Sequence, residues 1–159
     1  MFVTNYSCPI TVQTFEEKLE QLDLEPIAFQ LMHSGEGEWT HQRTMQAIAQ
    51  YRQFLYLIYL YPNRSLVPSQ DIDRVWHHHI LDTMKYVQDC QMLFGYFVHH
   101  FPYFGLRGES DRHSWQAAVE QTQVSFQEHF GMDAAITQES LQFADCQPLG
   151  YLTDLTRPY

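Results

Sequence analysis

Basic residues, paired cysteines and long apolar runs are all scarce in this chain of 159 residues. Nine lysines and arginines stand against nineteen aspartates and glutamates, which gives a formal net charge of −10 at pH 7. A surface this acidic repels phosphate backbones and anionic lipids, because both carry charge of the same sign. We therefore expect no nucleic-acid or membrane partner, which leaves a small molecule or another protein.

Cysteine occurs only at positions 8, 90 and 146, without a C-x-x-C pair, and this spacing excludes a disulfide framework. The first residues lack the basic region and apolar run of a secretory signal. The most apolar run, residues 54–61, is far shorter than the roughly 20 residues that cross a bilayer. Together these absences predict a soluble cytoplasmic protein.

Apolar and aromatic residues are abundant, at 45% and 15% of the chain, so a packed core is expected. The apolar positions recur with helical spacing, and no stretch alternates with a period of two for long enough to require a strand. The sequence predicts an all-α fold, a compact bundle of four to six helices. We expect residues 1–146 to form a single helical domain and residues 147–159 to form a C-terminal tail.

Capping and helix-breaking residues set the expected helix boundaries. Thr14 and Glu17 have the spacing of a capping box, and Asp23 and Ser69 are suitable N-caps for later helices. Gly131 is a natural residue to follow the end of a helix. The predicted helices cover residues 15–22, 24–33, 40–61, 70–94 and 112–130, with a further helical turn or two over 96–101 and a short last helix over 133–143.

One stretch, residues 69–105, contains five of the nine histidines. Asp73 and His77 lie one turn apart on the same face of the predicted helix, an arrangement that suits two ligands of one metal ion. A third ligand would come from His99 or His100, because that segment can fold back after the helix ends near Gly95. Two imidazoles and a carboxylate predict zinc or iron as the metal. The alternative is a buried polar pair, in which Asp73 only orients His77.

His79 and Asp82, three residues apart, lie on a different face of the same helix. This spacing suggests a catalytic pair, in which the carboxylate orients a histidine general base, or a second pair of metal ligands. A purely structural hydrogen bond, on the helix surface or in the core, is the favoured explanation of the spacing. His78 falls between the two faces, and we expect it to be the most solvated of the three histidines. Three other carboxylates are expected to be helix caps or solvated charges, namely Asp71, Asp89 and Asp111.

Widely used catalytic signatures are absent: the sequence has no H-E-x-x-H, no G-x-S-x-G, no Walker loop and no G-x-G-x-x-G. No substrate or reaction is therefore indicated. Two function hypotheses from different classes remain. The first is a metal-binding protein that could act as an enzyme. The second is a metal-free helical interaction module with structural core histidines, and a pH-sensing histidine cluster is a third reading.

Several short motifs resemble those of one family. The run Asp73-x-x-Trp76-His77-x-His79-x-Leu81, followed by Tyr86-x-x-Asp89-Cys90, resembles the signature of the glycine-rich domain-containing protein-like family. The segments 99–105 and 107–109 resemble the short bacterial form of that family. The resemblance covers roughly residues 51–131. Because the chain lacks the glycine-rich part of the plant members, roles tied to that part do not carry over, and the resemblance implies no particular reaction.

Overall fold

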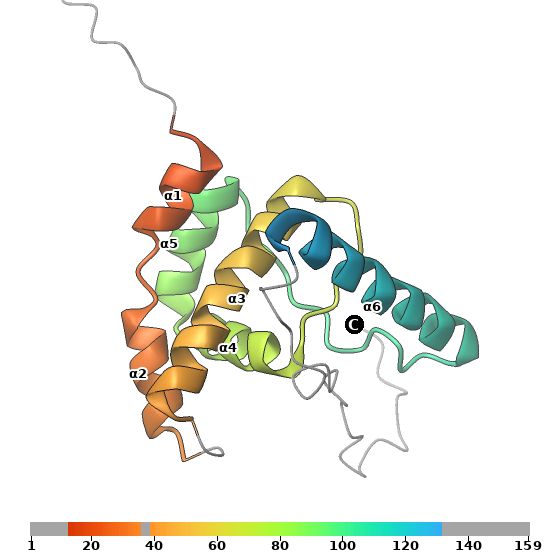
Figure 1. Cartoon of the computed structure of the whole chain (residues 1–159), viewed down its shortest axis with the longest axis horizontal. Coiled ribbons are helices and arrows are strands. Elements are labelled where there is room, and N and C mark those ends of the chain that lie inside the picture. Colours follow the sequence, from red (N-terminus) through yellow and green to blue (C-terminus); the bar gives the residue numbers. More distant parts are fainter. Residues whose placement is uncertain (1–12, 36–38, 132–159) are drawn as a thin grey trace, which may run out of the picture.

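The computed structural model describes residues 13–35 and 39–131, which form six α-helices without a strand among them. The predicted all-α bundle is thereby confirmed (Figure 1). The helix predicted over 133–143 and the tail predicted over 147–159 lie outside the described residues. The six helices are α1 (Phe15–Gln21), α2 (Glu25–His33), α3 (His41–Leu60), α4 (Gln70–Leu81), α5 (Thr83–Phe94) and α6 (Glu109–Phe130).

Helix α3 is the central element of the bundle. It contacts α1, α2, α4 and α6, and Figure 1 shows it running between the α1–α2 side of the molecule and α6. Its long apolar stripe explains this position, because Tyr51, Phe54 and Leu57 are all almost completely buried. The core around them also takes apolar side chains from α1, α2, α4 and α5. A smaller cluster formed by Val67, Ala118 and Val119 secures α6.

Two helix starts follow the predicted capping residues, whereas α2 has Leu24 as its N-cap in place of the expected Asp23. The Thr14 amide donates to the Glu17 carboxylate at 2.8 Å, and the Glu17 amide donates to the Thr14 hydroxyl at 3.2 Å, which completes the predicted capping box. Ser69 caps α4 as predicted. Helix α6 begins at Glu109, three residues before the expected start, with Gly108 as its N-cap.

The helix predicted over 70–94 is in fact two helices that meet at Asp82. The ψ angle of Asp82, 71°, is not helical, so this residue ends α4 and begins α5. The two halves pack against different partners, since α4 contacts α2 and α3 whereas α5 contacts α1. A straight helix could not make both sets of contacts, and no glycine or proline marks the break. Tertiary packing therefore decides this corner.

The segment that follows α5 is an extended connection to α6. Gly95, at φ 77°, ends α5 in the left-handed conformation. The helical turns predicted over 96–101 are absent, and bends and turns lead to Gly105 at φ 90°. Asp111 accepts hydrogen bonds from the backbone amides of Gly105 and Arg107, which fixes the connection to the first turn of α6. Among the described residues, no helix has both the length and the apolarity needed to cross a bilayer.

We predict that Gly105→Ala lowers the free energy of unfolding by about 3 kcal/mol, since alanine at this positive φ is strained and overpacked. A Cβ atom at this position would lie only 2.9 Å from Cγ of Trp115. Gly35→Ala is the matched control, with a similar φ of 71° and no atom within 4 Å of the added Cβ. The control should lose about 1 kcal/mol in urea unfolding. Equal losses would show that the contact with Trp115 does not constrain the connection.

Candidate metal centre

Three of the four predicted metal ligands meet at one point on the surface of α4. Asp73 and His77 come from adjacent turns of α4, and His100 comes from the connection after α5. Nε2 of His100 lies 2.8 Å from Oδ1 of Asp73, and Nδ1 of His77 lies 3.1 Å from Oδ2. One ligand atom from each of the three residues falls within 4.8 Å of the others. The cluster therefore offers two imidazole nitrogens and one carboxylate oxygen.

The carboxylate of Asp73 is the negative centre of this cluster. Burial alone would raise its pKa, but the hydrogen bonds from His100 and His77 outweigh burial and lower the pKa to about 2. The hydrogen bond to Asp73 in turn raises the pKa of His77. Asp73 is thus ionised across the neutral range, as an anionic metal ligand must be.

The orientation of His77 is fixed from the backbone side. Its Nδ1 lies 2.7 Å from the backbone carbonyl oxygen of Asp73. Because a carbonyl only accepts, the proton belongs on Nδ1 in this contact, and the lone pair of neutral His77 is then on Nε2. The side chain of His77 is 48% exposed, compared with 14% for Asp73 and 15% for His100. The cluster therefore opens to solvent on the His77 side.

A pair of buried hydrogen bonds holds the connection that carries His100. Nε1–H of Trp76 donates to the hydroxyl of Tyr86 at 2.9 Å, and that hydroxyl donates to the carbonyl of Val98 at 2.6 Å. Val98 lies two residues before His100, whose ring packs edge-on against Trp76 with centroids 4.6 Å apart. Local spacing does not predict this pair, because Trp76 lies on α4 and Tyr86 lies on α5, beyond the break at Asp82.

His79 is buried, and its partners are Tyr51 and Asp89 rather than the predicted Asp82. The Tyr51 hydroxyl lies 2.9 Å from Nδ1, and Oδ2 of Asp89 lies 2.8 Å from Nε2. Lys85 also pairs with the Asp89 carboxylate, at 2.9 Å. Asp82 stands at the corner between α4 and α5, and the described residues show no hydrogen bond from its carboxylate to His79. The predicted catalytic pair is therefore not formed, because the break at Asp82 redirects α5 and presents Asp89 instead.

Other expectations for the histidines and carboxylates are corrected by the same geometry. His99 is exposed and packs against Phe97, whereas His100 lies against Asp73. His78 is partly buried, and His77 is the exposed member of the three. The carboxylates expected to be caps or solvated charges have specific partners instead: Asp71 pairs with Arg43, Asp89 with His79 and Lys85, and Asp111 with Arg107.

The fold and this cluster define a small all-α protein whose surface brings two histidines and one aspartate together. The model of the UCP032817-like family matches residues 14–130, and the chain belongs to this family. The comparisons also bear out the resemblance to glycine-rich domain-containing proteins that was inferred from the motifs. No solved structure matches the chain.

Two similar proteins come from Arabidopsis thaliana. The chain is 33% identical to Glycine-rich domain-containing protein 1 over 90 residues, which cover 54% of this chain and 11% of the plant protein. It is 39% identical to Glycine-rich domain-containing protein 2 over 59 residues, which cover 35% of this chain and 8% of the plant protein. The matches thus span about a tenth of the length of these relatives.

We predict that Tyr86→Phe lowers the free energy of unfolding by about 1–3 kcal/mol, because Trp76 N–H and the Val98 carbonyl lose a buried partner. Hydrogen exchange of the amides of residues 97–101 should accelerate in this variant. Tyr96→Phe is the control, since Tyr96 lies exposed on the same connection. The control should change stability by less than about 0.5 kcal/mol. Unchanged exchange in Tyr86→Phe would contradict the role of the hydroxyl.

We predict an acid-sensitive contribution of Asp73 to stability. Its pKa is lowered in the folded state, so its stabilisation is present above the unfolded pKa near 4 and is lost as the pH falls toward 2. A shift of about two units corresponds to about 2.5 kcal/mol. Urea unfolding between pH 5 and pH 2 should show this loss in the wild type and a shallower one in Asp73→Asn. Glu128→Gln, on the exposed side of α6, should retain the wild-type slope.

Proposed function

We propose that this protein binds a divalent transition metal, zinc or ferrous iron, through Asp73, His77 and His100. The convergence of three ligand atoms within 4.8 Å carries the proposal. Nitrogen and oxygen donors of this kind suit zinc, and two histidines with one carboxylate also suit ferrous iron. The backbone contact at Nδ1 would leave Nε2 of His77 as its donor to the metal, as in histidines that are oriented through their second nitrogen.

Three protein ligands leave part of the coordination sphere for water or a substrate, in contrast to a closed structural site with four. A metal held there would polarise a bound oxygen atom or activate water. Asp73 would supply the negative charge, and the two imidazoles would bind as neutral ligands. A small molecule could reach the metal from the exposed side, at His77. On the opposite side, the ring of Trp76 packs against His100 and would block access.

Protons compete with the metal for this site. The His77 ring must be neutral to donate a lone pair, and the raised pKa of His77 means that it stays protonated to higher pH than an ordinary histidine. Metal affinity should therefore rise with pH through the neutral range and should be weak in mild acid.

The competing function is a metal-free interaction module. It is favoured by the hydrogen bonds that Asp73 already accepts from both histidines. It is favoured as well by the exposed aromatic side chains of the connection between α5 and α6, which are Tyr96, Phe97, Phe101 and Tyr103. In this reading the histidines only hold the connection on α4, and the aromatic surface contacts another protein.

Metal binding is tested by elemental analysis of the untagged protein, followed by calorimetric titration of chelator-treated protein with zinc and, without oxygen, with ferrous iron. We expect about one equivalent to bind and the thermal midpoint to rise, because the metal binds only the folded form. His77→Ala and His100→Ala should each weaken metal binding by about 100-fold or more. Loss of a residue that only hydrogen-bonds a metal ligand already weakens metal binding by about 10- to 100-fold, and loss of a ligand itself should cost at least as much.

His99→Ala is the matched control, since His99 neighbours His100 in sequence but is exposed and outside the cluster. It should bind metal like the wild type, and circular dichroism should confirm that all variants are folded. Chelator-treated protein that takes up neither metal would refute the proposal and favour the interaction module. Equal losses in His99→Ala and His100→Ala would refute the assignment of the ligands.

A further inference from the structure

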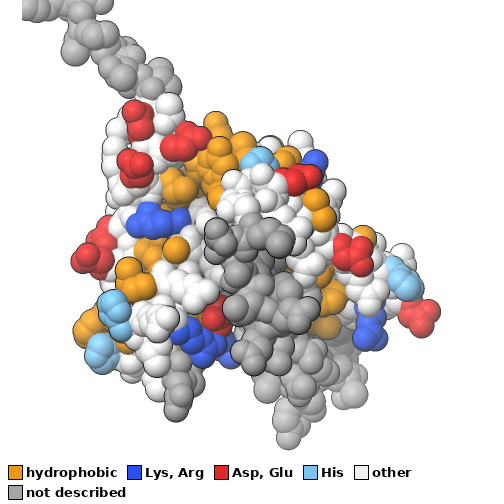
Figure 2. Space-filling model, in the orientation of Figure 1, with side chains coloured by type: hydrophobic (Ala, Val, Ile, Leu, Met, Phe, Trp, Pro, Cys, Tyr) orange, Lys and Arg blue, Asp and Glu red, His pale blue; other side chains and the backbone are white. Residues whose placement is uncertain are grey.

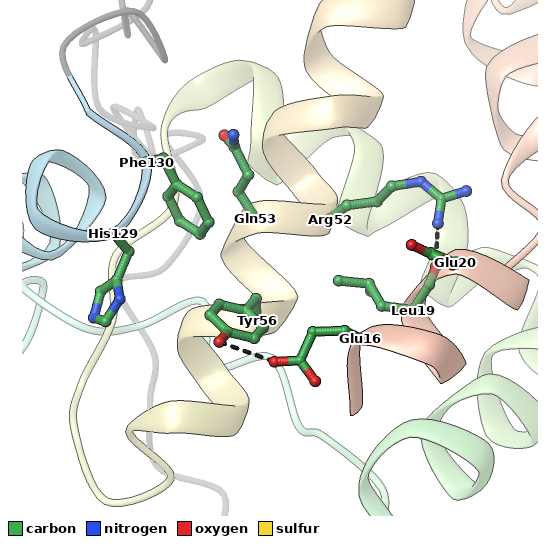
Figure 3. Close-up of a pocket in the computed structure, with 8 residues that line it drawn as sticks. All are labelled: Glu16, Leu19, Glu20, Arg52, Gln53, Tyr56, His129 and Phe130. Carbon is green, nitrogen blue, oxygen red and sulfur yellow. Dashed lines mark hydrogen bonds between the residues drawn. The ribbon is translucent and has the colours of Figure 1, made fainter. Parts of the chain in front are cut away.

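An open cavity on the surface, of about 570 Å³, lies along the outer face of α3. Its walls come from α1, α3 and the C-terminal end of α6 (Figure 3). It shares no residue with the cluster of Asp73, His77 and His100. Its volume falls within the range typical of small-molecule sites.

The inner surface of the cavity is largely apolar and aromatic. Leu19 projects from α1, Tyr56 from α3 and Phe130 from the end of α6. The rings of Tyr56 and Phe130 meet edge-on, with centroids 6.1 Å apart. Two aromatic rings at a steep angle can enclose an apolar body or face a cation with their π surfaces.

Two of the side chains that line the cavity, Tyr56 and Arg52, make donor hydrogen bonds within the protein. The Tyr56 hydroxyl donates to Oε1 of Glu16 at 3.1 Å. The Arg52 guanidinium turns to α1, where it donates to the backbone carbonyls of Leu19 and Leu22. Neither side chain directs these donor bonds into the cavity.

The acceptors, in contrast, are in excess. Oε1 of Gln53 is buried and has no hydrogen-bond partner. Among the described residues, no hydrogen bond or ion pair involves the Glu20 carboxylate. Glu16 and Glu20 lie one turn apart on α1, where two like charges repel each other. Figure 2 shows acidic side chains over α1 beside hydrophobic ones that face the end of α6.

We propose that this cavity binds an organic amine, a protonated primary ammonium group on an apolar or aromatic body. The ammonium group would donate to the carboxylate of Glu20, which accepts no hydrogen bond from the described residues. Its N–H donors are the groups that the acceptor-rich lining lacks. The apolar body would pack between Leu19, Tyr56 and Phe130.

The test is a titration of the full-length protein with three probes of one shape and different charge, at physiological ionic strength. The probes are 2-phenylethylammonium, the neutral 2-phenylethanol and the anionic 3-phenylpropionate. We expect the ammonium probe to bind saturably in the millimolar range typical of a fragment. Its chemical-shift changes should map to the amides of residues 16–20, 52–56 and 129–130, and the other two probes should bind at least about tenfold more weakly.

Two variants test the assigned groups. Glu20→Gln keeps the shape of the side chain and removes the charge, so it should weaken ammonium binding about tenfold. Gln53→Leu removes the unpartnered oxygen, so it should stabilise the fold or leave it unchanged. Glu128→Gln is the control, since Glu128 is exposed on α6 and outside the lining, yet its loss changes the net charge equally. This control should bind the ammonium probe like the wild type.

Equal binding of the three probes would overturn the proposal, because charge would then not select the ligand. Equal weakening of ammonium binding in Glu20→Gln and Glu128→Gln would also overturn the proposal. The binding would then reflect only the attraction of a cation to the net negative charge of the protein. Shift changes that map outside the cavity would have the same consequence. None of these results depends on whether the histidine cluster binds metal.

Discussion

The arrangement of the central helices depends on the two hydrogen bonds made by the buried imidazole of His79. This imidazole links three helices at once, because it lies on α4 and bonds to Tyr51 of α3 and to Asp89 of α5. An imidazole this deeply buried must have partners for both nitrogens, since an unpartnered one costs about 1–3 kcal/mol. Only a break between α4 and α5 brings Asp89 back to a histidine ten residues earlier. The corner at Asp82 and the pairing of His79 are therefore two aspects of one packing solution.

The cluster of Asp73, His77 and His100 follows from the same corner. With α5 folded back, Tyr86 meets Trp76 and fixes the Val98 carbonyl, so that the connection returns across α4. His100 then lies over Asp73, which already has His77 one turn above it. Local helical spacing supplies two of the three groups, and long-range packing supplies the third. An open, partly exposed set of two histidines and one carboxylate is the result.

The two proposed sites make opposite chemical demands. At the cluster on α4, nitrogen lone pairs and one carboxylate are available for a cation that accepts electron pairs. At the cavity beside α1, oxygen acceptors and aromatic faces are available for a cation that donates hydrogen bonds. A cationic ligand at each of the two proposed sites agrees with the acidic composition of the chain, because its negative charge attracts cations.

The sequence by itself determined the features that depend on near neighbours. Capping residues such as Thr14 and Ser69 mark helix starts because their side chains bond amides only three residues away. The i, i+4 spacing placed Asp73 beside His77 for the same reason. Tertiary structure alone decided the break at Asp82, the partner of His79 and the choice of His100 over His99. These outcomes depend on which helices share a core, and that competition involves contacts between residues far apart in the chain, which local spacing does not encode.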